Sequence, residues 1–251
     1  MKWLFASIST FSNFYEIYFY KFFKKMPNYL RLWNGAKFKV LNLNSNLGTI
    51  LEVWRDNVYA ATLELKGKKG LVIVDIGANI GAFTIFALRK FNNPKIFAYE
   101  PETNNFTLLC KTLNLNNGED FVKVFKKAVY GRVGVINLSL AGESSGKNSV
   151  EIDQGLGQFE KVECTTLASV IEDNKISFCD LLKIDCEGSE YEILFNSPTE
   201  VLEKVGMIIL EWHNVVGYSV SDLVKFLESV GFNVERSEKN ESLIVARRTV
   251  D

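Results

Sequence analysis

The feature that most constrains the fold is the segment 72–84, which reads VIVDIGANIGAFT. A continuous apolar run at 71–74 has the pattern of a strand that is buried on both faces. The strand ends on Asp75, and Gly77 and Gly81 then bracket a tight turn before an apolar stretch that predicts a helix. A strand, a glycine turn and a helix N-terminus in this order favour a nucleotide-type ligand site.

The spacing of the glycines in this turn indicates which kind of nucleotide-type ligand it suits. A G-x-G-x-x-G dinucleotide fingerprint from Gly77 needs glycines where the chain has Asn79 and Ala82, and no Gly-Lys-Ser/Thr phosphate loop follows. Asp75-x-Gly77-x-Asn79-x-Gly81 instead resembles the first motif of Rossmann-like S-adenosylmethionine (SAM)-dependent methyltransferases. There Asp75 would reach the SAM ammonium directly or through water, and the glycines would let the backbone approach the ligand. An ordinary strand–turn–helix packed for stability is the alternative.

Composition fits a globular protein without disulfides. A chain of 251 residues can bury a large core, and its net charge of -1 gives no support to nucleic-acid binding. The four cysteines form no C-x-x-C pair and there is one histidine, so we expect no zinc site. We interpret the cysteines as reduced core residues of a cytoplasmic protein.

Residues 1–65 are expected to form an N-terminal extension. Apolar and aromatic residues recur at helical spacing over 1–26, but polar residues interrupt them too often for a membrane-spanning helix. We expect an amphipathic helix packed on the domain, and a peripheral helix lying on a membrane surface is the open alternative. Residues 30–41 predict a hairpin around Asn34-Gly35, and 45–62 predict a helix.

Residues 66–251 alternate strands with helices, which predicts a doubly wound, mostly parallel α/β sheet. Core strands are expected at 71–75, 96–99, 122–129, 180–185 and 206–212, with a closing hairpin at 232–236 and 242–247. An antiparallel pair is expected at 133–140 and 160–165, joined by a glycine- and serine-rich loop that we interpret as a substrate lid. The expected fold is therefore the seven-stranded sheet of a class I methyltransferase behind an N-terminal extension.

Polar side chains follow four of the predicted strands, where ligands bind in such sheets. These residues are Asp75, Glu100, Asp185 with Glu187, and Glu211 with His213. Glu100 can accept both ribose hydroxyls of a nucleotide, or it can simply begin a helix beside Pro101.

Three of these residues are candidates for catalysis. His213, with an unperturbed pKa of about 6.5, suits a general base, although a supporting or surface role is equally open. Asp185 and Glu187 are the competing bases, because burial and mutual repulsion can raise a carboxyl pKa. We expect no metal; the open alternative is a divalent cation held by Asp185, Glu187 and Glu211.

A more particular resemblance lies in the segment 184–190, IDCEGSE, preceded by Leu181-Leu182-Lys183. Together with Tyr99-Glu100-Pro101, Lys127-Ala128-Val129 and Leu210-Glu211-Trp212-His213, it resembles the FkbM family of methyltransferases over roughly residues 70–215. The resemblance implies SAM-dependent O-methylation of a hydroxyl on a sugar, glycolipid or small metabolite.

Site residues carry over from this resemblance by position. It implies that SAM is lined by Asp75, Gly77, Asn79, Gly81 and Glu100. Asp185 would lie at the methyl-transfer end. The acid that holds the adenine amine in many methyltransferases is absent after the third strand, so backbone groups near Ala128 are expected there instead.

Two other functions remain open. One is a non-catalytic scaffold that keeps the SAM fold and binds a partner or membrane through residues 1–26. The other is a nicotinamide-dependent oxidoreductase, favoured by Glu100 and opposed by Asn79 and Ala82. For the methyltransferase, we expect a small-molecule or glycan acceptor and no nucleic acid.

Overall fold

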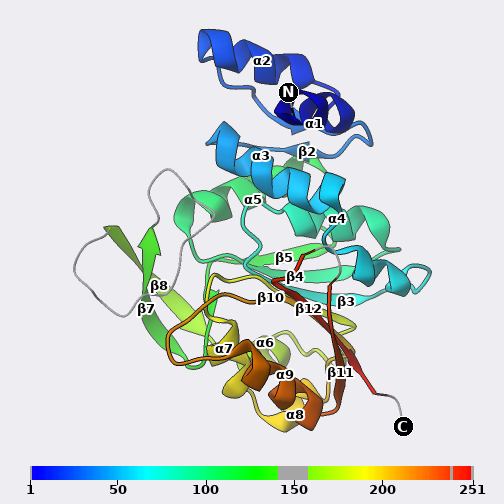
Figure 1. Cartoon of the computed structure of the whole chain (residues 1–251), viewed down its shortest axis with the longest axis vertical. Helices are drawn as coiled ribbons and strands as arrows, with labels where there is room; N and C mark the ends of the chain where they lie inside the picture. The colour runs from blue at the N-terminus through cyan, green and yellow to red at the C-terminus, as the bar shows by residue number, and fades with distance from the viewer. Residues whose placement is uncertain (1, 141–157, 238–239, 250–251) are drawn as a thin grey trace.

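The computed structural model describes residues 2–140, 158–237 and 240–249 (Figure 1). Its centre is a seven-stranded sheet with the order β11-β12-β10-β9-β3-β4-β5. In chain order its strands are β3 (Val72–Ile76), β4 (Lys95–Tyr99), β5 (Val122–Phe125), β9 (Leu181–Ile184), β10 (Met207–Glu211), β11 (Phe232–Arg236) and β12 (Leu243–Arg248). The five strands from β10 to β5 in this order are parallel, and β12 is antiparallel to both of its neighbours. The predicted sheet and its antiparallel closing hairpin are confirmed.

Helices cover both faces of this sheet (Figure 1). One face carries α3 (Leu43–Leu51), α4 (Ala82–Lys90) and α5 (Thr103–Leu115), and the other carries α6 (Leu167–Asp173), α7 (Glu190–Phe195), α8 (Thr199–Leu202) and α9 (Val220–Ser229). Successive residues of β3 enter the two resulting cores in turn: Ile73 packs with the first group and Val74 with the second. This alternation explains why the central strands read as continuous apolar runs.

The N-terminal segment contains two helices, α1 (Lys2–Thr10) and α2 (Phe14–Phe23), so the expectation of one helix over 1–26 is wrong. The chain breaks between them because Asn13 bonds to the neighbouring hairpin, donating to Tyr29 O and accepting from Arg31 N at 2.8 Å each. No helix among the described residues is long and apolar enough to cross a membrane.

The predicted hairpin is present as β1 (Leu30–Arg31) and β2 (Lys37–Phe38). The helix expected over 45–62 is shorter than predicted: α3 is followed by a π-helical turn at Glu52–Asp56 and a 3₁₀ helix at Ala60–Leu65. Asn57 ends the turn in the left-handed region, with φ 53°, and this redirects the chain. Apolar residues of this extension share one core with the sheet face beneath them.

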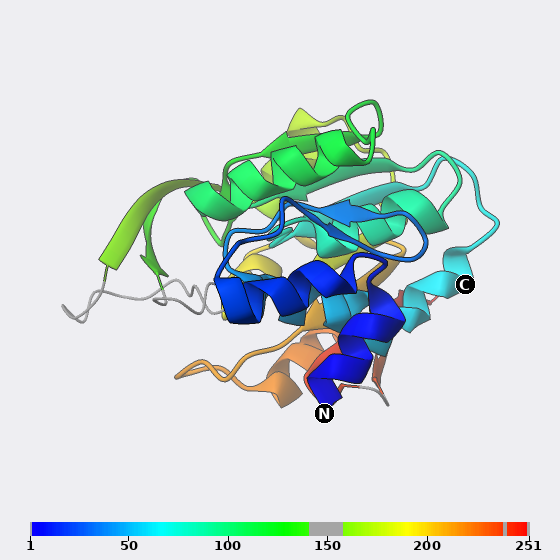
Figure 2. The same cartoon turned by 90° about the horizontal axis from the view of Figure 1, so that it is seen from above.

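The third predicted strand, 122–129, divides between two sheets. The chain leaves the main sheet after β5. β6 (Ala128–Val129) then pairs with β8 (Gln158–Thr165), which in turn pairs antiparallel with β7 (Gly134–Leu140). The β7–β8 pair was predicted, and it projects as an arm beside the main sheet (Figures 1 and 2). The segment interpreted as a substrate lid lies, at 141–157, outside the described residues.

Candidate active site

A cavity of about 210 Å³ lies at the carboxyl ends of the parallel strands. Its walls come from the turn after β3, the ends of β4, β9 and β10, the β6 region and the N-terminal extension. Of the predicted site residues, those lining it are Gly77, Asn79, Glu100, Asp185, Glu187 and His213, and Glu211 lines it as well. The sequence-based expectation that strand ends converge on one site is therefore confirmed by the geometry.

The glycine turn lies against β9 and α5. A Cβ on Gly77 would lie 1.7 Å from the carbonyl oxygen of Asp185, so only glycine permits this approach. A Cβ on Gly81, at φ +90°, would lie 2.8 Å from Leu109 on α5. Gly77 lines the cavity, whereas Gly81 serves the packing of the turn against α5; a contact between Gly81 and SAM stays a prediction.

Glu100 closes the far side of the turn. Its Oε2 accepts from Asn79 N at 2.8 Å, and its Oε1 accepts from Glu102 N at 2.9 Å. Burial raises the pKa of Glu100 from 4.5 to about 7, although these two backbone donors oppose the shift. Its contact with the ribose hydroxyls of SAM stays a prediction.

Asp75 lies behind the turn and not on the cavity wall. Its side chain is fully buried, and Oδ2 accepts from Thr84 Oγ1 at 2.6 Å. Oδ1 has no hydrogen-bond donor but lies 3.2 Å from Lys183 Nζ. Lys183 in turn donates to Gly77 O at 2.7 Å and lies 3.7 Å from Asp185 Oδ2. The structure therefore gives Asp75 protein partners, and its reach to SAM stays a prediction.

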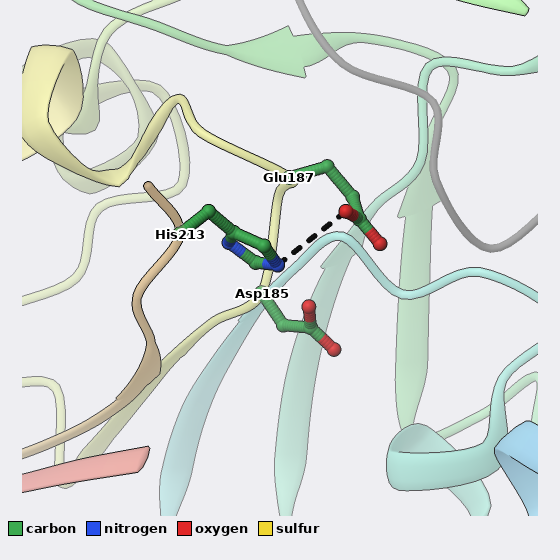
Figure 3. Close-up of side chains that lie close together, drawn as sticks. All are labelled: Asp185, Glu187 and His213. Carbon is green, nitrogen blue, oxygen red and sulfur yellow. Dashed lines mark ion pairs between the residues drawn. The ribbon is translucent and has the colours of Figure 1, made fainter. Parts of the chain in front are cut away.

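Asp185, Glu187 and His213 lie close together on the wall of the same cavity (Figure 3). One ligand atom from each can be chosen so that all lie within 4.8 Å of one another. The ring of His213 points toward Glu187, with Nε2 3.4 Å from Oε2. Glu211 is outside this group, and its carboxylate accepts from Ser242 Oγ at 2.8 Å. The metal set considered from sequence, which included Glu211 and omitted His213, is therefore wrong in its third member.

Glu190 holds His213 from behind. It is fully buried, and its Oε1 accepts from His213 N at 2.6 Å and lies 3.2 Å from Nδ1. Burial lowers the pKa of His213, but the hydrogen bond and charge of Glu190, with the charges of Glu187 and Asp185, raise it to about 9. Burial raises the pKa of Glu187 to about 7. The argument for His213 as a base from an unperturbed pKa therefore fails, and its catalytic role stays a prediction.

Two residues of the extension complete the wall and were missed from sequence. Tyr59 is buried and donates from its hydroxyl to Asp185 Oδ2 at 3.3 Å. Glu52 lines the cavity, and burial, helped by the charges of Glu211 and Asp185, raises its pKa to about 7. Both come from a region whose pattern indicated only a helix.

The four cysteines differ in their burial. All four are free, and Cys164 and Cys179 are buried. Cys186 lines the cavity, where its thiol lies 3.8 Å from Glu190 Oε2. The expectation of core positions therefore holds for Cys164 and Cys179, whereas Cys110 and Cys186 are only partly buried, and the reduced state of all four stays a prediction.

The sheet order, the glycine turn after its central strand and the acid after the next strand define a class I SAM-dependent methyltransferase. Residues 75–234, more than half of the chain, match the methyltransferase FkbM domain. The chain belongs to the FkbM methyltransferase family.

Two curated relatives show the extent of the similarity. Methyltransferase sdnD of Sordaria araneosa is 29% identical over 210 residues, which cover 70% of this chain and 81% of the relative. The 31-O-demethyl-FK506 methyltransferase FkbM of Streptomyces tacrolimicus is 27% identical over 235 residues, covering 82% of this chain and 88% of the relative. The similarity to the second relative extends over most of both chains.

Proposed function

We propose that this protein transfers the methyl group of SAM to a hydroxyl oxygen of a small metabolite, sugar or glycolipid. The observation that carries the proposal is the placement of Asp185, Glu187 and His213 on the wall of the same cavity that Gly77, Asn79 and Glu100 line. A relative of similar length is named for methylating a compound lacking an O-methyl group, which supports oxygen as the acceptor atom.

In the proposed complex, SAM lies across the turn after β3. Glu100 accepts the ribose hydroxyls, and Gly77 and Asn79 let the backbone approach the ligand. Ala128 and Val129 line the cavity where the adenine contact is expected. This arrangement directs the sulfonium toward Asp185.

The chemical step is a displacement in line. The acceptor oxygen attacks the methyl carbon, the carbon–sulfur bond breaks, and the acceptor proton leaves to a carboxylate or to water. Tyr59 and Lys183 hold Oδ2 of Asp185, which fixes the direction of this carboxylate. Asp185 and Glu187 are thereby positioned to orient the hydroxyl and to receive its proton.

The test combines binding with product chemistry on the purified full chain. SAM and its demethylated product should each give saturable calorimetric binding, weakened at least about tenfold by Glu100→Gln and unchanged by the exposed control Glu163→Gln. Labelled methyl transfer to hydroxylated acceptors should give a product stable to mild alkali, as an ether is and an ester is not. Failure of folded protein to bind SAM would remove the proposal. SAM binding without transfer to any acceptor would favour the scaffold, and nicotinamide binding would favour the oxidoreductase.

We also propose that α2 contacts an anionic lipid surface. It exposes Tyr15, Phe19, Phe22 and Phe23, the last two by 79% and 71%, and exposed lysines follow at 24 and 25. Aromatic side chains beside lysines suit the membrane interface. Their position at the outer end of the molecule leaves this face accessible (Figure 1).

Sedimentation with phosphatidylcholine vesicles, with and without phosphatidylserine, tests this contact. The full chain should pellet with the anionic vesicles, and Phe22→Ser with Phe23→Ser should abolish pelleting. The control Val133→Ser, an exposed apolar residue on another surface, should not change it. No pelleting of the wild type, or a concentration-dependent dimer lost in the same double variant, would assign the face otherwise and overturn the proposal.

A further inference from the structure

We infer that Asp185, Glu187 and His213 form a binding site for one divalent cation, of the kind represented by Mn²⁺. The three residues come from the loops after β9 and β10, so the parallel sheet itself brings them together. Their ligand atoms converge within 4.8 Å, and Figure 3 shows all three side chains directed into one space. Carboxylate oxygens and one imidazole nitrogen make a set that suits Mn²⁺ better than a soft metal.

The residues behind this group support the ligands individually. A metal-binding histidine ordinarily donates a hydrogen bond from the N–H of its second ring nitrogen, often to a carboxylate, and this fixes the tautomer. Glu190, fully buried, occupies that position at Nδ1 of His213, while the backbone N–H of His213 also donates to it. Nε2 is thereby turned toward Glu187 and Asp185. Glu190 itself is held by Gly188 N at 2.9 Å.

Asp185 is supported in the same way from the opposite side. Tyr59 and Lys183 both approach its Oδ2, at 3.3 and 3.7 Å. Among the described residues, only Tyr59 and Lys183 make a hydrogen bond or an ion pair with this carboxylate, so Oδ1 remains for a ligand. Lys183 also donates to the carbonyls of Ile76 and Gly77 and forms an ion pair with Asp75. Its charge is therefore shared and does not by itself neutralise Asp185 and Glu187.

The charge of the whole cavity points the same way. Among the described residues that line it, five are acidic and two are lysines. SAM brings one net positive charge, from a sulfonium and an ammonium against one carboxylate. With His213 neutral, as a metal ligand must be, the formal surplus that remains is about two negative charges, which a divalent cation balances.

The inference rests on the proposed function and makes its chemistry more specific. A cation at this position would bind the acceptor hydroxyl beside the SAM methyl group and lower the pKa of that hydroxyl. The oxygen then attacks the methyl carbon as the carbon–sulfur bond breaks, and its proton leaves to water. The site therefore favours acceptors that present a hydroxyl with a second oxygen nearby, as vicinal diols and hydroxy-carbonyl groups do, since both oxygens can reach one cation.

Titration of the purified full chain with Mn²⁺, followed by electron paramagnetic resonance, tests the site without requiring turnover. We expect one saturable site whose spectrum carries nitrogen modulation from a coordinated imidazole. Asp185→Asn and Glu187→Gln should each weaken binding at least about tenfold, and Glu190→Gln should weaken it by about 10- to 100-fold, the usual effect of losing a supporting partner. His213→Gln should remove the nitrogen modulation.

Glu211→Gln is the matched control, because it removes an equal charge from the same cavity but from outside the group. It should retain Mn²⁺ affinity within about threefold. Wild-type protein with no saturable Mn²⁺ site, or with a site lacking imidazole modulation, overturns the inference. Equal losses in Glu211→Gln and Asp185→Asn also overturn it, since they would show diffuse attraction. SAM calorimetry on the same samples separates the two proposals: SAM binding without Mn²⁺ binding removes only the cation site, and the converse removes only the methyltransferase assignment.

Discussion

The buried lysine of β9 provides the sharpest test of how the site is held together. Lys183 is 2% exposed, and its partner Asp75 is fully buried. Burial lowers the pKa of Lys183, but the charges of Asp75 and Asp185 outweigh it and raise that pKa, so the amine stays charged. Lys183→Met would leave Oδ1 of Asp75 with neither a hydrogen-bond donor nor a nearby cation.

The expected cost follows from the burial of both partners. Removing one member of a buried ion pair destabilises a protein by about 3–5 kcal/mol, because the remaining charge is uncompensated. Urea denaturation should therefore show the free energy of unfolding of Lys183→Met reduced by about this amount. Adding Asp75→Asn should recover about 0.5–3 kcal/mol, the range of coupling between residues in contact.

The exposed pair of Lys225 and Asp222, 3.8 Å apart, provides the control. Lys225→Met should change stability by no more than about 0.5 kcal/mol, as expected of a surface substitution. If Lys183→Met is as stable as the wild type, or if the effects of Lys183→Met and Asp75→Asn simply add, Asp75 is not held as a charge by Lys183. The reasoning about the floor of the cavity would then be wrong.

Two further predictions concern the cavity wall. Gly77→Ala should abolish SAM binding and destabilise the fold by several kcal/mol in thermal melts, because its Cβ would overlap the Asp185 carbonyl. The control is Gly35→Ala, at a position with a similar φ of +86° but open space around it, which should cost only about 1–2 kcal/mol. A small effect of Gly77→Ala on both measurements would contradict the close approach. The pKa of Glu100 is raised to about 7, so its contribution to stability is complete below the unfolded value near 4.5 and is lost as pH rises through about 7. Thermal melts of ligand-free Glu100→Gln from pH 4 to 8 should lack this loss of stability. A loss equal to that of the wild type would exclude the raised pKa of Glu100. The SAM affinity of the wild type should rise over the same pH range, because the ionised carboxylate is the stronger hydrogen-bond acceptor.

The strand-end part of the site could be predicted because its residues are local to recognisable motifs. The run at 71–84 specifies strand, turn and helix together, and Gly77 is required by one backbone contact. Lys183 had a signal that was not used, since a lysine in an otherwise buried strand needs buried partners. Glu190 belongs to the motif 184–190, but its role could not be predicted, because its contact with His213 joins two segments far apart in the chain.

Most of the remaining errors come from tertiary contacts that no local sequence pattern indicates. Residues 122–129 have the pattern of one strand, but pairing with β8 moves the last part into a second sheet. Glu52 and Tyr59 reach the cavity only because the extension packs across the sheet. The helix α6 was missed although Thr166 caps it by accepting from Ser169 N, a signal that could have been used.

The origin of Glu52 and Tyr59 has an evolutionary consequence. The segment matched to the FkbM domain begins at residue 75, so these two residues lie outside it although they line the same cavity. Under the proposed function, mutations there would change the cavity wall beside Asp185 and leave the turn after β3 as it is. We therefore expect that exchanging the first 65 residues between family members would change the preferred acceptor and leave SAM binding unchanged.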